Sequence, residues 1–213
     1  MSLKLLNKAI LLSFITIGYN MIEGVVSAYF GGADESLVLI GFGVDSFVEV
    51  ISGLGIFHMI LRMKKIKSTE LKQRDKFERT ALIITGVSFY ILTAGLITGA
   101  VLSLVAGAKP ETTIAGIIIA SLSIASMYWL MKSKTDVGVK LNSPAIIADA
   151  NCTRTCFYLS FILLAASLIY EMTGIGYIDA IGSLGIAYYA FKEGKESFGK
   201  SKQSSVDVCN NCH

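Results

Sequence analysis

Apolar residues form six long runs along the chain, and short polar segments separate the runs. In chain order, the runs are Ala9–Phe30, Leu37–Leu61, Leu82–Ala106, Thr113–Met131, Pro144–Tyr170 and Ile175–Phe191. A helix needs about 20 mostly apolar residues to cross the hydrocarbon core of a membrane. The pattern therefore predicts an all-α integral membrane protein with six transmembrane helices.

Positive charges are distributed unequally between the segments that connect these runs. Residues 31–36, 107–112 and 171–174 contain a single Lys and no Arg. The N-terminal segment, residues 62–79, residues 132–140 and the C-terminal segment together contain 17 Lys and Arg. Short segments rich in Lys and Arg stay on the cytoplasmic side of a membrane. We therefore expect both termini and residues 132–140 in the cytoplasm.

Composition excludes several other classes of protein. Apolar residues make up 53% of the 213 residues and charged residues 16%, whereas soluble chains have about 45–50% and about 25%. A disordered chain and a basic nucleic-acid-binding protein are both excluded by these values. We expect residues 1–198 to form one transmembrane domain and residues 199–213 to form a short, disordered cytoplasmic tail.

Charged side chains inside the apolar runs are the candidate functional residues. A charge at the centre of a bilayer costs at least about 2.5–3.5 kcal/mol and usually marks an ion or proton pathway. Acidic residues outnumber basic ones in these runs, which favours a cation over an anion. The five acids are Glu23, Asp45, Glu49, Asp149 and Asp179, the base is Arg154, and the amides are Asn20 and Asn151.

Two pairs of side chains have the spacing of metal ligands. Asp45 and Glu49 are four residues apart, as are Cys152 and Cys156, so each pair lies on one face of a helix. Adjacent carboxylates need a shared proton or a cation between them. Thiolates and carboxylates together suit zinc and its heavier relatives better than magnesium, calcium or manganese. The alternatives are carboxylates hydrogen-bonded to neighbouring helices and cysteines that act as small apolar residues.

These residues resemble the cation diffusion facilitators, a family of proton-coupled exporters of zinc and related divalent metals. The similarity covers almost all of the six-run region. The matching motifs are Glu23-Gly24, residues 36–40 followed by Asp45-x-x-x-Glu49, residues 141–145, Ala148-Asp149-Ala150 and residues 177–181.

The resemblance implies that the transported metal is held between the second and fifth helices. Asp45 matches one family ligand directly, and Glu49 stands where the family has a second Asp. Cys152 replaces the expected His and Cys156 replaces the expected Asp, which suggests altered metal selectivity. Glu23, Asp149, Asp179 and Asn20 are then candidates for the surrounding shell or a proton relay.

The resemblance also sets expectations for assembly. Family members usually carry a folded C-terminal cytoplasmic domain that helps dimerisation, and we expect this chain to lack it. A homodimer would then form through membrane helices, with Gly95-x-x-x-Gly99 as a candidate contact. An ordinary packing contact within one subunit is an equal alternative for these glycines.

We therefore expect a secondary transporter in the cell membrane of a bacterium or archaeon. It would export zinc, or cadmium or a related ion, from the cytoplasm in exchange for protons. Two alternatives remain open: a membrane metal-binding or sensor protein that does not transport, and a thiol-redox membrane protein. No Walker phosphate loop or catalytic triad is present, so we expect no enzymatic activity, no prosthetic group and no nucleic-acid partner.

The chain ends with a Cys-x-x-Cys-His sequence. Two thiols, an imidazole and the terminal carboxylate could capture a soft metal ion near the inner mouth of a transporter. A disordered tail without such a role is an equal alternative, and a thiol redox pair is a third. The residues concerned are Cys209, Cys212 and His213.

Overall fold

The computed structural model describes residues 3–33, 37–64, 71–106, 114–173 and 178–202. These residues form six α-helices and, within the described ranges, no strand. The helices are α1 (Leu3–Ala33), α2 (Leu37–Met63), α3 (Leu71–Ala106), α4 (Ile114–Leu141), α5 (Pro144–Thr173) and α6 (Ile178–Lys202). The prediction of an all-α fold with six long helices is confirmed.

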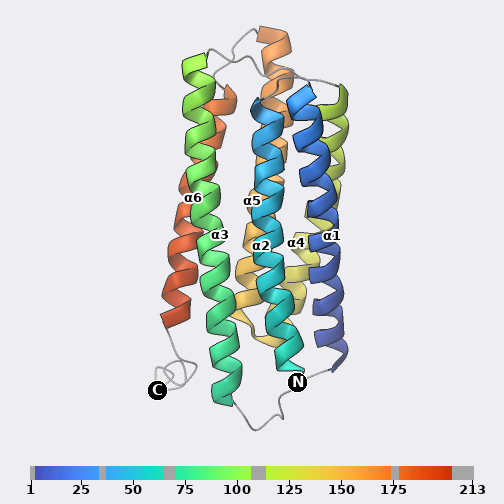
Figure 1. The fold of residues 1–213 in the computed structure, drawn as a ribbon, viewed down its shortest axis with the longest axis vertical. Coiled ribbons are helices and arrows are strands. Elements are labelled where there is room, and N and C mark those ends of the chain that lie inside the picture. The colour runs from blue at the N-terminus through green and yellow to red at the C-terminus, as the bar shows by residue number, and fades with distance from the viewer. Residues whose placement is uncertain (1–2, 34–36, 65–70, 107–113, 174–177, 203–213) are drawn as a thin grey trace.

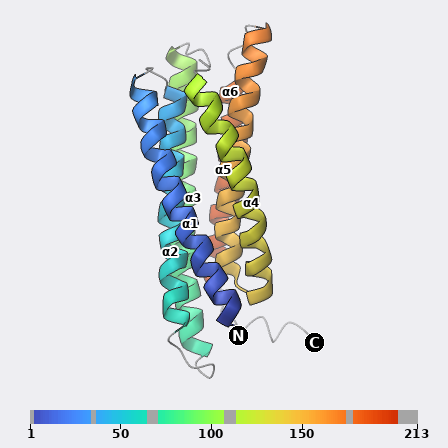
Figure 2. The ribbon, with the colours of Figure 1, turned by 90° about the vertical axis from the view of Figure 1, so that its right-hand side faces the viewer.

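The helices run antiparallel to their neighbours in sequence and form an elongated bundle (Figures 1 and 2). The most extensive packing is between α1 and α2, between α3 and α6, and between α4 and α5. α2 also packs against α3 and α5, and α5 in addition contacts α3 and α6. The start of α1 and the end of α6 lie at the same end of the bundle (Figure 1).

Several helices extend well beyond the apolar runs. α3 begins at Leu71 although its apolar run begins at Leu82, and α4 continues from Met131 to Leu141. Backbone hydrogen bonding does not stop where hydropathy falls, so apolar length underestimates helix length. Among the described residues, three segments are long and apolar enough by themselves to cross a membrane: Leu3–Phe30, Phe42–Met63 and Lys76–Val105.

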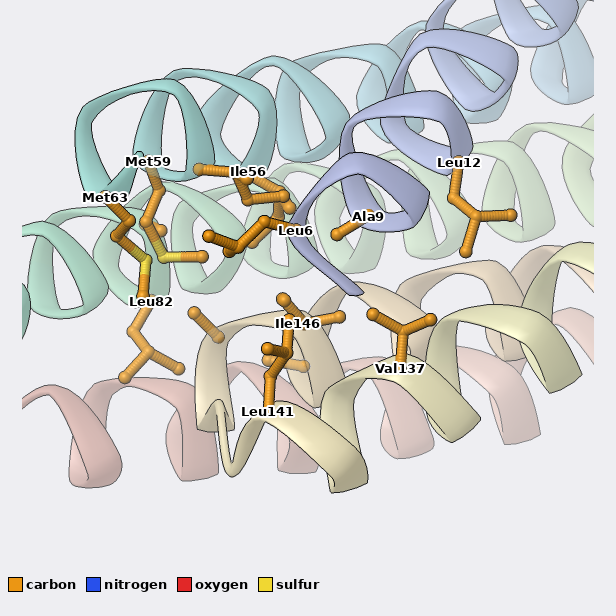
Figure 3. Close-up of a cluster of buried hydrophobic side chains, with 14 of the residues drawn as sticks. Leu6, Ala9, Leu12, Ile56, Met59, Met63, Leu82, Val137, Leu141 and Ile146 are labelled. Atoms are coloured by element: carbon orange, nitrogen blue, oxygen red, sulfur yellow. The ribbon is translucent and has the colours of Figure 1, made fainter. Parts of the chain in front are cut away.

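A cluster of buried apolar side chains closes the bundle at the end where α1 begins (Figure 3). It draws Leu6 from α1, Met59 from α2, Leu82 from α3, Val137 from α4 and Ile146 from α5, among others. The outer surface is also apolar, as expected for helices that contact lipid. Its exposed side chains include Phe14, Tyr29, Val105, Trp129, Phe161 and Tyr188.

α4 and α5 are joined by a tight turn with a specific backbone geometry. Asn142 has φ 48°, the left-handed region that helices use at the residue after their C-terminus. Its N–H donates to the Val139 carbonyl at 3.1 Å, and the Ser143 N–H donates to the Gly138 carbonyl at 3.0 Å. This pair of bonds is a Schellman motif, and Pro144 directly after it begins α5, as the fixed φ of proline favours. The turn fixes how α5 packs on α4.

α1 and α2 approach each other through glycine. A Cβ placed on Gly43 would lie 3.0 Å from the Gly24 carbonyl oxygen and 3.2 Å from the Ala28 nitrogen, both backbone atoms. The two helices are therefore close enough to share hydrogen bonds between short side chains. Gly95 and Gly99 of α3 differ, because a Cβ on either would have nothing within 4 Å. Both are exposed, so the alternative of a packing contact within one subunit is wrong for these two glycines.

Candidate metal and ion-pair site

The four predicted metal ligands lie buried where α2 faces α5. Asp45 and Glu49 of α2 are 3% and 0% exposed, and Cys152 and Cys156 of α5 are 0% and 2% exposed. The spacing of four residues places each pair on the inward face of its helix. The structure therefore brings thiols and carboxylates from two helices into one region without contact with solvent.

Contacts within this region link the two helices. The Cys156 thiol interacts with the Asp45 carboxyl group, and the Cys152 and Cys156 thiols interact with each other. Two buried carboxylate oxygens, Asp45 Oδ1 and Glu49 Oε2, have no hydrogen-bond partner in the described part of the protein. Buried polar atoms are nearly always partnered, so these two oxygens are candidate positions for a bound cation.

A lysine that the sequence analysis placed in a cytoplasmic segment enters this site. Lys134 of α4 is 2% exposed. Its Nζ lies 2.9 Å from Asp149 Oδ2 and 3.5 Å from Glu49 Oε1, and it donates to Thr153 Oγ1 at 2.8 Å. The Thr153 hydroxyl in turn donates to Glu49 Oε1. One ammonium group therefore joins carboxylates of α2 and α5.

The expectation that Lys134 belongs to a connecting segment is thus corrected, because it lies in α4 with its side chain inside the bundle. The apolar run of α4 ends at Met131, but the helix continues, and its next turn carries Lys134 back into the bundle. The excess of acids over bases in the apolar runs was the signal that could have found it. Burying unpaired carboxylates is costly, and a basic residue from outside the apolar runs is one way to balance their charge.

The ligand candidates do not form a closed coordination shell in this conformation. Among the residues whose positions are described, no three His, Cys, Asp or Glu side chains converge closely enough to hold a metal ion. Glu49 is occupied on one oxygen by Lys134 and Thr153. A metal bound by all four candidates would therefore draw these side chains closer together.

Glu23 lies near the site but is held by hydroxyl groups. The Tyr19 hydroxyl donates to Glu23 Oε1 at 3.1 Å and the Ser46 hydroxyl donates to Oε2 at 3.0 Å. Ser123 of α4 also interacts with this carboxyl group. Asn20 donates to the Thr16 carbonyl at 2.9 Å, and its own carbonyl oxygen has no described partner. Glu23 thus ties α1 to α2 and α4.

The opposite side of α5 carries a second polar group. Asn151 donates to Glu193 Oε2 of α6 at 2.7 Å, and Arg154 interacts with Tyr189 of α6. Arg154 therefore faces α6, away from the two cysteines. Of the remaining predicted residues, Asp179 belongs to α6 but its side chain is not among those described. Cys209, Cys212 and His213 lie outside the described residues.

Comparison with known proteins agrees with this architecture. The cation efflux transmembrane domain matches residues 9–204. An uncharacterized transporter from Methanocaldococcus jannaschii is 26% identical over 174 residues, covering 81% of this chain and 61% of that protein. The magnetosome protein MamB from Magnetospira sp. is 24% identical over 190 residues, covering 86% of this chain and 61% of MamB.

The fold and the site define an integral membrane protein with charged groups buried between its helices. The chain belongs to the cation efflux family, whose transmembrane domain accounts for nearly all of its length. The resemblance to the cation diffusion facilitators is thereby confirmed. The chain spans about three fifths of the length of the two relatives it matches, 61% in each case.

Proposed function

We propose that this protein exports divalent metal ions of soft or borderline character from the cytoplasm, with zinc the principal substrate and cadmium or a related ion as the alternative. Membership of the cation efflux family supports cation transport, and one relative bears the name of a transporter. The observation that carries the choice of metal is the pairing of two buried thiols with two unpartnered carboxylate oxygens. Thiolate sulfur favours zinc and cadmium over hard cations such as magnesium.

In the proposed mechanism Asp45, Glu49, Cys152 and Cys156 bind the metal together. A thiol must lose its proton to become a ligand, so metal binding releases protons. When the metal leaves on the outer side, the emptied site takes protons up again, which makes export a metal/proton exchange. The route for these protons would pass by Glu23, Asn20 and Asp149, with Asp179 of α6 as a further candidate.

Assembly forms a second part of the proposal. Gly95 and Gly99 of α3 present an open, exposed surface, and close helix approach in membranes uses small residues of this kind. We infer a homodimer in the lipid bilayer that uses this surface of α3. We also propose that Cys209, Cys212 and His213 capture metal near the cytoplasmic entrance.

Flux measurements in sealed proteoliposomes test the proposed function. Zinc and cadmium uptake under an imposed pH gradient would be compared between the wild type, Asp45→Asn and the double variant Cys152→Ser/Cys156→Ser. Asp136→Asn is the matched control, since Asp136 is an exposed carboxylate of α4. We expect flux to be lost in both site variants and retained in the control. Loss of flux in Asp45→Asn alone would show that the two cysteines contribute to packing and do not bind the metal.

A different outcome would favour another function. Cadmium binding without flux in any variant would indicate a membrane metal sensor. Cys152 and Cys156 are both free and lie four residues apart on α5, and a thiol redox pair would form a disulfide or a mixed disulfide with a partner. Protection of both thiols from alkylation by cadmium supports the metal site, whereas a trapped mixed disulfide supports thiol redox chemistry.

A further inference from the structure

Lys134 is the positive charge of a network that joins three helices. Its ammonium group is buried and contacts Asp149, Thr153 and Glu49. We propose that Lys134 is the resident counter-cation of the empty site, and that it competes with the transported metal for Glu49. This proposal rests on the proposed function, because it requires Glu49 to be a metal ligand.

The contacts of Lys134 are unequal, and the inequality suggests how the exchange occurs. Asp149 Oδ2 and Thr153 Oγ1 lie 2.9 and 2.8 Å from Nζ, whereas Glu49 Oε1 lies 3.5 Å away. Asp149 also accepts a hydrogen bond of 2.8 Å from Ser52. Asp149 is therefore the firm anchor of the ammonium group, and Glu49 is the partner that it can release.

Glu49 is arranged to accept a second cation. Its Oε1 is engaged by Lys134 and Thr153, while its buried Oε2 has no described partner. Asp45 Oδ1, one helical turn away, is also buried and unpartnered. A metal that binds these oxygens lies near the ammonium charge, and repulsion between the two cations weakens metal binding. Loading therefore favours withdrawal of Lys134 onto Asp149 and Thr153.

The competition has a consequence for metal selectivity. Hard cations such as Mn²⁺ depend on carboxylate charge, whereas Cd²⁺ gains much of its affinity from thiolate sulfur. An ammonium group that neutralises Glu49 therefore penalises Mn²⁺ more than Cd²⁺. Lys134 would act as a specificity-determining residue, although it contributes no ligand atom to the metal.

Binding calorimetry on the purified full chain in detergent tests this inference. Cd²⁺ and Mn²⁺ affinities would be measured for the wild type, Lys134→Met and Lys134→Arg, with Asp45→Asn as the site control. Because a unit charge a few Å away acts strongly in a buried site, we expect Lys134→Met to tighten Cd²⁺ binding by about tenfold or more. We expect a larger gain for Mn²⁺, and Lys134→Arg should resemble the wild type.

Two further variants keep the result interpretable. Lys134→Met/Asp149→Asn removes one positive and one negative charge, so it tests the same competition if Lys134→Met alone fails to fold. In Glu49→Gln, the additional change Lys134→Met should tighten binding less than it does when Glu49 is present, because only the repulsion between the two cations remains and the competition for the carboxylate is gone. A purely structural lysine would not produce either pattern.

The outcomes separate the two proposals. Suppose that Cd²⁺ binding is unchanged or weaker in Lys134→Met and in Lys134→Met/Asp149→Asn, and is lost in Asp45→Asn. This result overturns the role of Lys134 and leaves the metal site intact. Equal gains for Cd²⁺ and Mn²⁺ overturn the selectivity argument. Absence of Cd²⁺ binding in the wild type and in every variant overturns the proposed function itself.

Discussion

Ser52 of α2 donates a 2.8 Å hydrogen bond to Asp149 Oδ1 of α5, while the other oxygen of the same carboxylate pairs with Lys134 of α4. Ser52 also lies 3.1 Å from the Thr85 hydroxyl of α3. The buried carboxylate of Asp149 thus contacts side chains from both α2 and α4. Ser52 links it in turn to α3. Asp149 belongs to the motif on which the family resemblance rests, and this contact gives it a structural role.

Replacement of Ser52 by Ala should destabilise the folded protein. The variant leaves Asp149 Oδ1 buried without its donor, and loss of a partner to a buried charged group costs about 1–3 kcal/mol. Unfolding of detergent-solubilised protein measures the change. Thr98→Ala is the control, because Thr98 is exposed and its hydroxyl donates to the Ala94 carbonyl of its own helix. This variant should stay within about 0.5 kcal/mol of wild type. Equal stability of the two variants would contradict the assigned role of Ser52.

Gly43→Ala should separate α1 from α2. The new methyl group would meet backbone atoms of Gly24 and Ala28, which cannot rotate away, and overpacking of this kind costs about 1–3 kcal/mol. Gly18→Ala of α1 has open space at the same atom and should be neutral or slightly stabilising. Thermal unfolding of both variants is the measurement. A neutral Gly43→Ala would show that α1 and α2 are less closely packed than described.

Asn142 should tolerate glycine but not a β-branched residue. Asn and Gly adopt its φ of 48° readily. For most other residues the left-handed region costs about 1–2 kcal/mol. We therefore expect Asn142→Val to lower stability and Asn142→Gly to preserve it. Comparable stability of the two variants in denaturant titrations would argue against the left-handed turn between α4 and α5.

Asp136 should contribute a pH-dependent contact between the start of α1 and the end of α4. Because Lys140 hydrogen-bonds to its carboxylate and Lys8 lies 3.6 Å away, the pKa of Asp136 is lowered from its ordinary value of 3.8. A carboxyl group with a lowered folded-state pKa stabilises the fold above the unfolded pKa and loses that contribution as pH falls through the folded one. The stability difference between wild type and Asp136→Asn should therefore shrink below about pH 4.

Since the Asp136 carboxylate is exposed, added salt should reduce the same difference at neutral pH. A difference that is independent of pH and salt would contradict the pairing.

The sequence was sufficient to predict the six helices and to predict which faces of α2 and α5 point inward. Long apolar runs identify helices because burial in lipid needs apolar length, and a spacing of four residues places Asp45 with Glu49 and Cys152 with Cys156. The ends of the helices were less predictable. α4 continues from Met131 to Leu141, because helical hydrogen bonding persists where the side chains become polar.

The role of Lys134 could not be read from its neighbours in sequence. Lys132 and Lys140 flank it, and a count of positive charges treats all three alike. Its ion-pair partners, Glu49 and Asp149, lie on helices whose positions around α4 follow from packing of the whole bundle. The charge imbalance inside the apolar runs favoured a cation, and the structure shows that Lys134 supplies one positive charge there.

Trp129 is the single tryptophan of the chain, and its side chain is 53% exposed on the outer surface of α4. It lies less than two helical turns before Lys134, on the helix that supplies the ammonium group. Its fluorescence is therefore an optical reporter for α4 that needs no added label. Quenching by lipids brominated at defined acyl positions gives its depth in the bilayer, and a change in emission during metal titration follows α4 as the site is filled.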